Sequence, residues 1–425
     1  MKKPPVESQA ANVGFISTRL SGMDGVSLEA EKWAGVLERH DCRCFYFAGE
    51  LDRPRERSLL VEEAHFKHPE VLEIQRACFG RGSREEKVTR RIHRLREKLK
   101  KALRDFIERF DLHLLIIENA LSLPLNLPLG LAIAELLSET GIPAIGHHHD
   151  FYWERPRLLV GAVWEYINMA FPPTLPTIRH VVINSSAQHQ LSLRTGAASV
   201  EIPNVIDFEN PPQPPDEYAS DLRETFGVGD DELFVLQPTR VVARKGIEHS
   251  IELVRRLDMP AKLVISHASG DEELEYEQRV RAYSDMLGVQ TVFVAQQMDD
   301  ERGRTPSGEK IYCLGDVYPH ADLVTYPSTK EGFGNAFIET IYYRKPIVVN
   351  TYTIYTIDIK PKGFQVIELE HYVTEETVRR TKQILSDEKT RREMVEHNYE
   401  LGRRYYSFAV LEKKLRTLLS DCLGR

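Results

Sequence analysis

Two carboxylates that could accept hydrogen bonds from a ligand lie close together late in the chain. Seven residues separate Glu331 from Glu339, and this segment follows the apolar run Ala321 to Tyr326 and leads into a helical pattern. The apolar run predicts a buried strand. Glu339 would then lie about one turn into the helix, where its oxygens could accept hydrogen bonds from both hydroxyls of a ribose. Glu331, on the loop, could reach the hydroxyls of a sugar.

The loop between these glutamates suits the close approach of a ligand. Gly332 and Gly334 allow the backbone to pass next to a bound molecule, and Asn335 could cap the following helix. The amides of such a loop and the N-terminus of the helix would face a diphosphate. Solvated glutamates and glycines that merely turn the chain would explain the same string, so a functional assignment needs matching segments elsewhere.

A second segment combines a strand with cations. The strand predicted near Leu233 to Gln237 runs into a basic loop that contains Arg240 and Lys245, and the pattern from Ile247 to Leu257 predicts the next helix. Breaking a glycosyl phosphate bond leaves negative charge on the departing diphosphate, and fixed cations stabilise that charge where it develops. Arg240 and Lys245 could do this, whereas Arg244 between them could simply be solvated.

Together, these segments resemble the motifs of retaining glycosyltransferases of family four, which have the GT-B fold. The resemblance spans most of the chain and implies an α/β protein with two Rossmann-like domains whose parallel sheets face each other across a cleft. It implies that Glu339 holds the ribose and that Arg240 and Lys245 hold the diphosphate. Glu331 would position the donor together with a run of loop residues: Gly332, Phe333, Gly334 and Asn335.

A third segment of interest lies near the N-terminus. The strand predicted near Val13 to Ser17 is followed by a glycine-containing loop and by a helical pattern from Leu28 to Arg39. The loop does not have the GxGxxG spacing, which disfavours a nicotinamide cofactor. By the resemblance, Gly22 and Gly25 would contact the donor sugar nucleotide and Asp24 would contact the acceptor.

This N-terminal loop departs from the family pattern. Members of the family commonly have paired glycines here, whereas Met23 and Asp24 separate Gly22 from Gly25 in this chain. Ser27 could be the N-cap of the helical pattern that begins directly after it, and this structural explanation competes equally with a ligand contact.

Three consecutive histidines end another predicted strand. Adjacent side chains on a strand point to opposite faces, so His147 and His149 could share a metal ion but His148 could not. No spaced cysteine or histidine partner is evident, and no metal site is predicted. The resemblance instead places a histidine, often followed by an aspartate, near the donor sugar at this strand end. It therefore gives catalytic roles to a set of five residues: His149, Asp150, Arg240, Lys245 and Glu331.

The segment after the histidines contains residues that could recognise an acceptor. Trp153 could stack on the face of a sugar, although a buried aromatic on a folded loop is equally consistent with the sequence. Arg155 and Arg157 could bind an acidic group of the acceptor, or could pair with Glu154.

Length and composition fit a two-domain protein of the cytoplasm. The 425 residues exceed a single core, and 42% hydrophobic residues allow each domain a packed interior. A formal net charge of −8 disfavours nonspecific nucleic-acid binding. Five scattered cysteines form no disulfide framework, so a reducing compartment is expected. Met1 to Pro5 lacks the apolar core of a secretion signal, and no apolar span of membrane-crossing length appears.

Strands and helices alternate in two series, which predicts two parallel sheets covered on both faces. We expect an N-terminal acceptor-side domain at 1–206, a proline-rich linker at 207–220 and a nucleotide-sugar-binding domain at 221–402. A C-terminal helix at 403–425 is expected to pack back on the N-terminal domain. The remaining strands are predicted near Cys44 to Phe47, Leu114 to Glu118, Ala144 to His147, His180 to Asn184, Val200 to Ile202, Lys262 to Ser266, Thr291 to Val294, Leu323 to Tyr326, Ile347 to Asn350 and Gln365 to Glu368.

The pattern from Arg84 to Phe110 predicts a long helix with one apolar face and one face crowded with lysine and arginine. A basic amphipathic helix can lie on an anionic membrane, which would point to a glycolipid acceptor. The alternative is a surface helix whose apolar face packs on the core. Core packing is favoured, because aromatic anchors are not interleaved with the basic residues.

The sequence thus predicts a retaining hexosyltransferase that uses a nucleoside diphosphate sugar, with GDP-mannose or UDP-glucose as donor. A peripheral-membrane glycolipid transferase, a sugar phosphorylase and a non-catalytic sugar-nucleotide sensor stay open as alternatives. No cofactor is required by the sequence, while divalent metal dependence and oligomeric state are left open. Thr18 to Gly22 and Asp24 to Glu29 are similar to segments of enzymes that make glycosylated glycerate solutes. This similarity implies a small polar acceptor and makes glycerate-type acceptors a candidate class.

Overall fold

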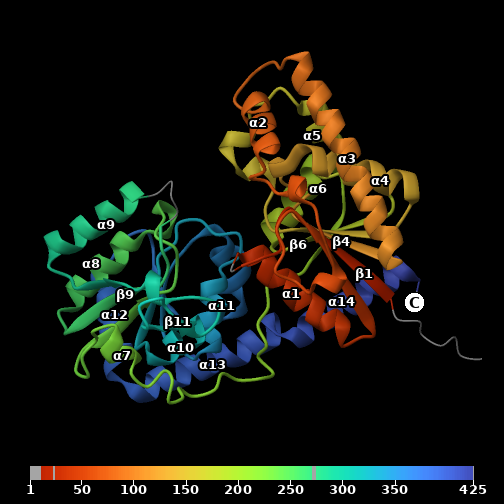
Figure 1. Cartoon of the computed structure of the whole chain (residues 1–425). Coiled ribbons are helices and arrows are strands. Elements are labelled where there is room, and N and C mark those ends of the chain that lie inside the picture. The colour runs from red at the N-terminus through yellow and green to blue at the C-terminus, as the bar shows by residue number, and fades with distance from the viewer. Residues whose placement is uncertain (1–10, 23, 270–273, 425) are drawn as a thin grey trace, which may run out of the picture. The chain divides into compact units, whose positions relative to one another are not determined.

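The computed structural model describes residues 11–22, 24–269 and 274–424, and the chain forms two compact units (Figure 1). The N-terminal unit comprises residues 1–203 together with 411–425, and the C-terminal unit comprises residues 204–410. The sequence-based expectations for Met23 and for Met1 to Pro5 fall outside the described residues.

The N-terminal unit is built on a seven-stranded sheet with the order β3-β2-β1-β4-β5-β6-β7. All neighbouring strands in it are parallel. In the central strand β4 every residue is buried, as expected where helices cover both faces of a parallel sheet. The strands are β1 (Ala11–Ile16), β2 (Cys42–Ala48), β3 (Ser58–Leu60), β4 (Leu114–Glu118), β5 (Ala144–His148), β6 (Ile178–Val182) and β7 (Ser199–Glu201).

The helices of this unit begin and end at residues suited to those positions. In α4, the Asn126 side chain accepts a hydrogen bond from the amide of Leu129, and Gly141 ends the helix in the left-handed conformation. The α-helices are α1 (Gly25–Glu38), α2 (Pro69–Cys78), α3 (Glu86–Phe110), α4 (Leu127–Thr140), α5 (Trp164–Ala170), α6 (Ser185–Thr195) and α14 (Phe408–Leu423).

The C-terminal unit has a six-stranded sheet with the order β10-β9-β8-β13-β14-β15, again with parallel neighbours. Its strands are β8 (Leu233–Gln237), β9 (Ala261–Ile265), β10 (Thr291–Phe293), β13 (Leu323–Tyr326), β14 (Ile347–Asn350) and β15 (Ile367–Leu369), and β11 (Gly303–Arg304) pairs separately with β12 (Lys310–Ile311). Its α-helices are α7 (Leu222–Thr225), α8 (Ile247–Leu257), α9 (Leu274–Leu287), α10 (Leu314–Val317), α11 (Asn335–Tyr342), α12 (Glu375–Ser386) and α13 (Glu388–Tyr406).

Each sheet has a point where the order of strands reverses. In the N-terminal unit this point lies between β1 and β4, and in the C-terminal unit it lies between β8 and β13. In open parallel sheets, ligands bind beyond the carboxyl ends of the strands at such points. The segments following β1, β4, β8 and β13 are therefore the places where the fold itself predicts a site.

The predicted fold class of two Rossmann-like α/β domains is confirmed, but two predicted helix caps are wrong. Helix α1 is capped by Asp24, whose side chain accepts hydrogen bonds from the amides of Val26 and Ser27, so Ser27 lies inside the helix. Helix α11 begins after Gly334, and Asn335 is its first residue rather than its cap. The short strands β3, β11 and β12 were not predicted, because two or three partly exposed residues carry no clear apolar alternation.

The long helix α3 packs its apolar face on the core, as the favoured alternative predicts. Ile92, Leu95, Leu99 and Leu103 are buried in the core of the N-terminal unit. Cations of its other face pair with acidic residues of neighbouring helices and loops: Arg94 with Glu70, Arg91 with Glu73, Lys98 with Glu63 and Lys100 with Glu135. These pairs reduce the positive charge that the helix could present to an anionic membrane.

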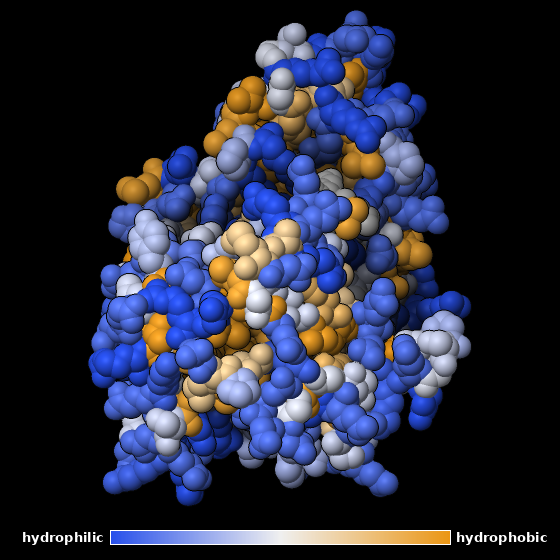
Figure 2. Space-filling model, turned by 90° about the vertical axis from the view of Figure 1, so that its left-hand side faces the viewer, coloured by the Kyte–Doolittle hydropathy of each residue, from blue (hydrophilic) through white to orange (hydrophobic). Residues whose placement is uncertain are grey.

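Two further observations bear on surfaces. Among the described residues, no helix combines the length and the apolar character needed to cross a membrane. Hydrophilic residues cover most of the face shown in Figure 2, with hydrophobic residues gathered in smaller groups between them. Helix α14 belongs to the N-terminal unit from Leu411 onward, and there Lys414 donates a hydrogen bond to the carbonyl of Glu201 and Glu412 pairs with His40 at 2.9 Å.

Candidate active site

The loop after β8 and the loop after β13 lie against each other in the C-terminal unit. Gly246 has a φ of 58°, and a Cβ at this position would lie 2.8 Å from the carbonyl oxygen of Pro327. A side chain is therefore excluded by both conformation and contact. The amide of Thr329 also donates a hydrogen bond of 2.8 Å to the carbonyl of Arg244. These contacts fix the basic loop next to the first of the two glutamates.

Lys245 and Glu331 form a buried ion pair between these loops. The side chains are 10% and 9% exposed, and Arg244 Nη1 lies 2.9 Å from Glu331 Oε2 on the other side of the carboxylate. Burial opposes the charge of Glu331, but Lys245 and Arg244 outweigh it and lower the pKa of the carboxyl group. Burial also lowers the pKa of Lys245, which Glu331 opposes. Arg244, for which the sequence left a merely solvated position open, thus contacts Glu331.

Arg240 is, like Arg244, an exposed cation of the same loop. Within the part of the chain that the structure describes, its guanidinium has no hydrogen-bonding or ion-pair partner. The next strand end adds His267, whose Nδ1 lies 2.7 Å from Ser266 Oγ. Burial, then Arg240 and Lys245, lower the pKa of His267 to about 4, so its ring is neutral at neutral pH. Sequence reasoning missed His267, which only its position after β9 could have indicated.

Glu339, the second of the two glutamates, lies on α11. Its Oε2 accepts a hydrogen bond of 3.0 Å from the hydroxyl of Tyr318, a fully buried residue. Tyr343 stacks on Tyr318 with ring centroids 4.8 Å apart and an interplanar angle of 6°. Burial and the charge of Glu339 raise the pKa of Tyr318, so the phenol keeps its proton and remains a donor. Sequence reasoning missed Tyr318.

The glycine loop before α11 is held in one conformation. Gly334 has a φ of 119°, and a Cβ there would lie 2.3 Å from the Tyr352 hydroxyl, which donates a hydrogen bond to the carbonyl of Phe333. The predicted donor contact of Phe333 cannot come from its ring, because that side chain is 4% exposed and packs against Tyr406. Gly332 is exposed, and Asn335 Oδ1 accepts a hydrogen bond of 2.6 Å from Asn204.

The three histidines of the N-terminal unit divide as the strand geometry predicts. His147 and His149 point to the same side and both contact the carboxylate of Glu118, a fully buried residue at the end of β4. His148 points away and lies 2.9 Å from His180 Nδ1. Burial opposes the charge of Glu118, but the charges and hydrogen bonds of His147 and His149 outweigh burial and lower the pKa of this carboxyl group to about 2.

Glu118 was not singled out from the sequence, where it is the polar end of an apolar strand. Among the described residues, Glu118, His147 and His149 are the group whose donor atoms come close enough to be considered for a metal ion, within 4.8 Å of one another. The carboxylate oxygen Oε2 lies 2.9 Å from His147 Nδ1 and 3.2 Å from His149 Nε2. These separations match hydrogen bonds from two imidazoles to one carboxylate.

In the segment after the histidines, Trp153 is not placed to stack on a sugar, one of the two alternatives that the sequence left open. Trp153 is 8% exposed, stacks on Phe151 at 4.3 Å and has Arg194 over its ring at 5.2 Å, so it belongs to the core rather than to a sugar-stacking surface. Arg155 forms an ion pair with Asp150, while Arg157 is exposed.

The N-terminal glycine loop is held by local hydrogen bonds. Gly22 has a φ of 68°, and its amide donates a hydrogen bond of 2.7 Å to Asp52. The carboxylate of Asp24 caps α1 and lies 3.1 Å from Arg19. Gly25 is the first residue of that helix. Asp24 therefore has a structural role in addition to the acceptor contact predicted for it.

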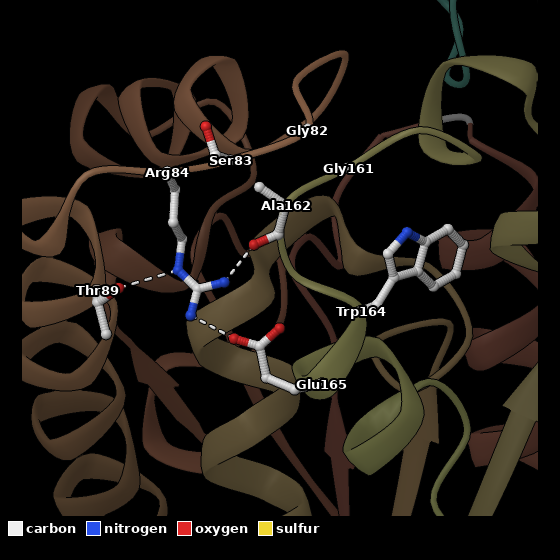
Figure 3. A pocket seen from close by; sticks show the side chains of 8 residues that line it. All are labelled: Gly82, Ser83, Arg84, Thr89, Gly161, Ala162, Trp164 and Glu165. Carbon is white, nitrogen blue, oxygen red and sulfur yellow. Dashed lines mark hydrogen bonds and ion pairs between the residues drawn. The ribbon is translucent and has the colours of Figure 1, made fainter.

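A separate cavity of about 450 Å³ in the N-terminal unit contains none of the predicted site residues (Figure 3). Its wall includes Arg84, whose Nε lies 2.9 Å from Thr89 Oγ1 and whose other nitrogens bind the carbonyl of Ala162 and the carboxylate of Glu165. The remaining lining residues are Gly82, Ser83, Gly161 and Trp164. Because Thr89, Ala162 and Glu165 already bind the guanidinium of Arg84, this group is not free to bind an anionic ligand in the cavity.

Comparisons with known proteins point in one direction. Residues 220–401 match the family model described as glycosyl transferases group 1. The chain is 31% identical to mannosylglucosylglycerate synthase of Thermotoga maritima, over 94% of this chain and 97% of that protein. It is 30% identical to mannosylglucosylglycerate synthase of Petrotoga mobilis, over 84% of this chain and 86% of that protein.

Solved structures share the fold at low identity. A glycosyltransferase from Rickettsia africae superposes with a TM-score of 0.69 at 13% identity, covering 97% of this chain and 98% of that one. HepE from Anabaena, in complex with UDP and glucose, superposes with a TM-score of 0.65 at 15% identity, covering 97% of this chain and 100% of that one.

Proposed function

Because the chain belongs to glycosyltransferase family four, we propose that it transfers a hexose from a nucleoside diphosphate sugar to a hydroxyl of a small polar acceptor, with retention of the anomeric configuration. The observation that carries this proposal is the grouping in the C-terminal unit of an exposed cation, Arg240, with the buried pair Lys245 and Glu331 beyond β8 and β13. Glu339 follows β13 on the next helix.

The proposed roles follow from the chemistry of each group. Arg240 and Lys245 bind the diphosphate and stabilise the charge that develops on it as the glycosyl bond breaks. Glu339, oriented by Tyr318, accepts hydrogen bonds from the ribose hydroxyls. When the diphosphate replaces Glu331 as the ion-pair partner of Lys245, the carboxylate of Glu331 binds hydroxyls of the sugar.

The transfer itself needs no covalent intermediate with the protein. The acceptor oxygen forms its bond to the anomeric carbon on the face from which the diphosphate departs, and an oxygen of the departing phosphate accepts the acceptor's proton. The products are the glycosylated acceptor and the free nucleoside diphosphate. His149 and Asp150 of the N-terminal unit orient the sugar during this step.

We propose GDP-mannose as the first donor to test and glucosylglycerate as the first acceptor. The relatives that cover most of this chain are mannosylglucosylglycerate synthases, and their name joins a mannosyl group to a glucosylglycerate. UDP-glucose with glycerate is the second combination. All five cysteines are free thiols, which fits a reaction in the cytoplasm.

A panel of donors and acceptors tests the proposal. Purified protein would be incubated with GDP-mannose or UDP-glucose and with glycerate, glucosylglycerate or no acceptor, and products would be identified by mass and by the anomeric coupling in NMR spectra. We expect a new α-linked product with one donor and a glycerate-type acceptor. Binding of sugar nucleotide without any product would refute a transferase, and a product of inverted configuration would refute retention.

A further inference from the structure

The end of strand β4 holds His149 through two consecutive residues. Glu118 is the last residue of β4 and pairs in register with His147 of β5, and Asn119 follows it directly. His149 lies two residues beyond His147, so its side chain returns to the same side of the sheet. Of these two strands, β4 lies beside β1, where the order of strands reverses.

Glu118 fixes the ring of His149. A carboxylate only accepts hydrogen bonds, so His149 Nε2, at 3.2 Å from Glu118 Oε2, must carry the proton that joins them. Nδ1 is then the nitrogen left for a ligand, and 10% of the side chain is exposed. His147 Nδ1 contacts the same carboxylate oxygen at 2.9 Å, and its ring stacks on Trp33 at 4.2 Å, so Glu118 has little freedom to move.

Asn119 fixes the main chain of His149. Its Oδ1 accepts a hydrogen bond of 2.8 Å from the amide of His149, and its own amide donates one of 3.0 Å to the carbonyl of His147. Its Nδ2 lies 3.4 Å from Asp150 Oδ1. Asn119 adopts a φ of 56°, in the left-handed region that asparagine tolerates better than most other non-glycine residues.

We infer that Glu118 and Asn119 are positioning residues for His149 and Asp150, setting the tautomer of the imidazole and presenting its Nδ1 to a hydroxyl of the reacting sugar. This inference rests on the proposed transferase function. It adds two residues to the site that act through His149 and do not touch the substrate. Neither residue is expected to bind the diphosphate.

Substitution of Glu118 by glutamine removes the negative charge and adds a hydrogen-bond donor while the shape of the side chain stays nearly the same. The amide of Glu118→Gln can donate to His149 Nε2, which would move the ring proton to Nδ1 and reverse its hydrogen-bonding role. We expect a roughly 10- to 100-fold loss of kcat with little change in the KM of the sugar nucleotide. Glu108→Gln on the exposed face of α3 is the matched control and should leave kcat unchanged.

A double-mutant cycle separates positioning from an independent effect. In a His149→Ala background, Glu118→Gln should change kcat less than about 2-fold, because the residue through which Glu118 acts is gone. Asn119→Asp keeps the oxygen that accepts a hydrogen bond from the His149 amide and should retain more activity than Asn119→Ala. This pair of variants tests the inference even if Glu118→Gln does not fold. Additive losses in the cycle, or wild-type kcat in both Glu118→Gln and Asn119→Ala, would overturn the inference.

A spectroscopic measurement is independent of turnover. Nitrogen-15 NMR of the histidine-labelled protein should show His149 protonated at Nε2 in the wild type and changed in Glu118→Gln. This result stands even if no donor in the panel reacts, so failure of the inference and failure of the proposed function are distinguishable. An Nδ1–H tautomer in the wild type, or stoichiometric binding of a divalent cation that Glu118→Gln abolishes, would overturn the inference.

Discussion

The hydroxyl of Tyr318 donates a hydrogen bond of 3.0 Å to Oε2 of Glu339. Tyr318 is fully buried and begins the short turn Tyr318–His320 that precedes β13, whereas Glu339 lies on the helix that follows β13. The strand and its two flanking segments therefore act together to orient one carboxylate toward the proposed ribose site.

Replacing Tyr318 by phenylalanine should weaken the binding of a nucleoside diphosphate. Loss of a hydrogen bond to a charged group costs about 1.5 kcal/mol, which corresponds to roughly a 10-fold increase in Kd. Isothermal titration calorimetry with GDP and UDP measures this effect. Tyr372→Phe, at a 73% exposed position of the same unit, is the control and should bind like the wild type. Equal affinity of Tyr318→Phe and the control would contradict the role of Tyr318.

Lys245→Ala should abolish most of the turnover, by roughly 100-fold or more, because it removes a preorganised cation from the departing diphosphate. It also leaves Glu331, 9% exposed, without its closest cation. Steady-state kinetics with the active donor tests this, and thermal unfolding of the same samples checks folding. Lys382→Ala on the exposed face of α12 is the matched control. Turnover of Lys245→Ala within 2- or 3-fold of this control would remove Lys245 from the mechanism.

Gly334→Ala should lower the free energy of unfolding by about 1–3 kcal/mol. Its φ of 119° is unfavourable for alanine, and the added Cβ would meet the Tyr352 hydroxyl at 2.3 Å. Gly35→Ala in α1 is the opposite case, since nothing lies within 4 Å of its Cβ and alanine favours helix. Denaturant titration should show destabilisation of the first variant and unchanged or higher stability of the second. The reverse order would show that the glycine loop is not constrained as described.

Acid should destabilise the N-terminal unit through His180. Burial lowers the pKa of this 4% exposed residue to about 4, against 6.5 in an unfolded chain. Between pH 6.5 and 4 the unfolded chain therefore binds a proton that the folded chain does not, and the free energy of unfolding falls as the pH falls. The full effect is up to about 3 kcal/mol. His180→Asn should flatten this part of the stability curve, measured by denaturant titration at several pH values. An unchanged slope would show that His180 does not titrate on unfolding.

The sequence was sufficient for much of the fold. Strands β8, β13 and β14 and helix α8 have the predicted bounds, because apolar runs and an amphipathic period specify them locally. The missed strands β3, β11 and β12 are too short to show such a period. Cap positions were predicted less well, since several polar residues near each helix start compete for that role.

The site could be predicted only in part. Motif spacing led to Lys245, Glu331 and Glu339, and the structure brings the first two into contact. It could not lead to Glu118 or Tyr318, because each acts through a partner that only the tertiary fold brings near. Trp153 shows the converse, since an aromatic residue next to a proposed site was packed into the core instead.

The most direct test of the account is whether Glu339 holds the ribose of the donor. Calorimetry would compare a nucleoside diphosphate with its 2′-deoxy analogue on the wild type, on Glu339→Gln and on the exposed control Glu393→Gln. We predict that Glu339→Gln binds the ribonucleotide at least about 10-fold more weakly and no longer distinguishes it from the deoxy analogue, while the wild type and the control do. Unchanged affinity of Glu339→Gln, with the same preference for the ribonucleotide as the wild type, would contradict the central claim.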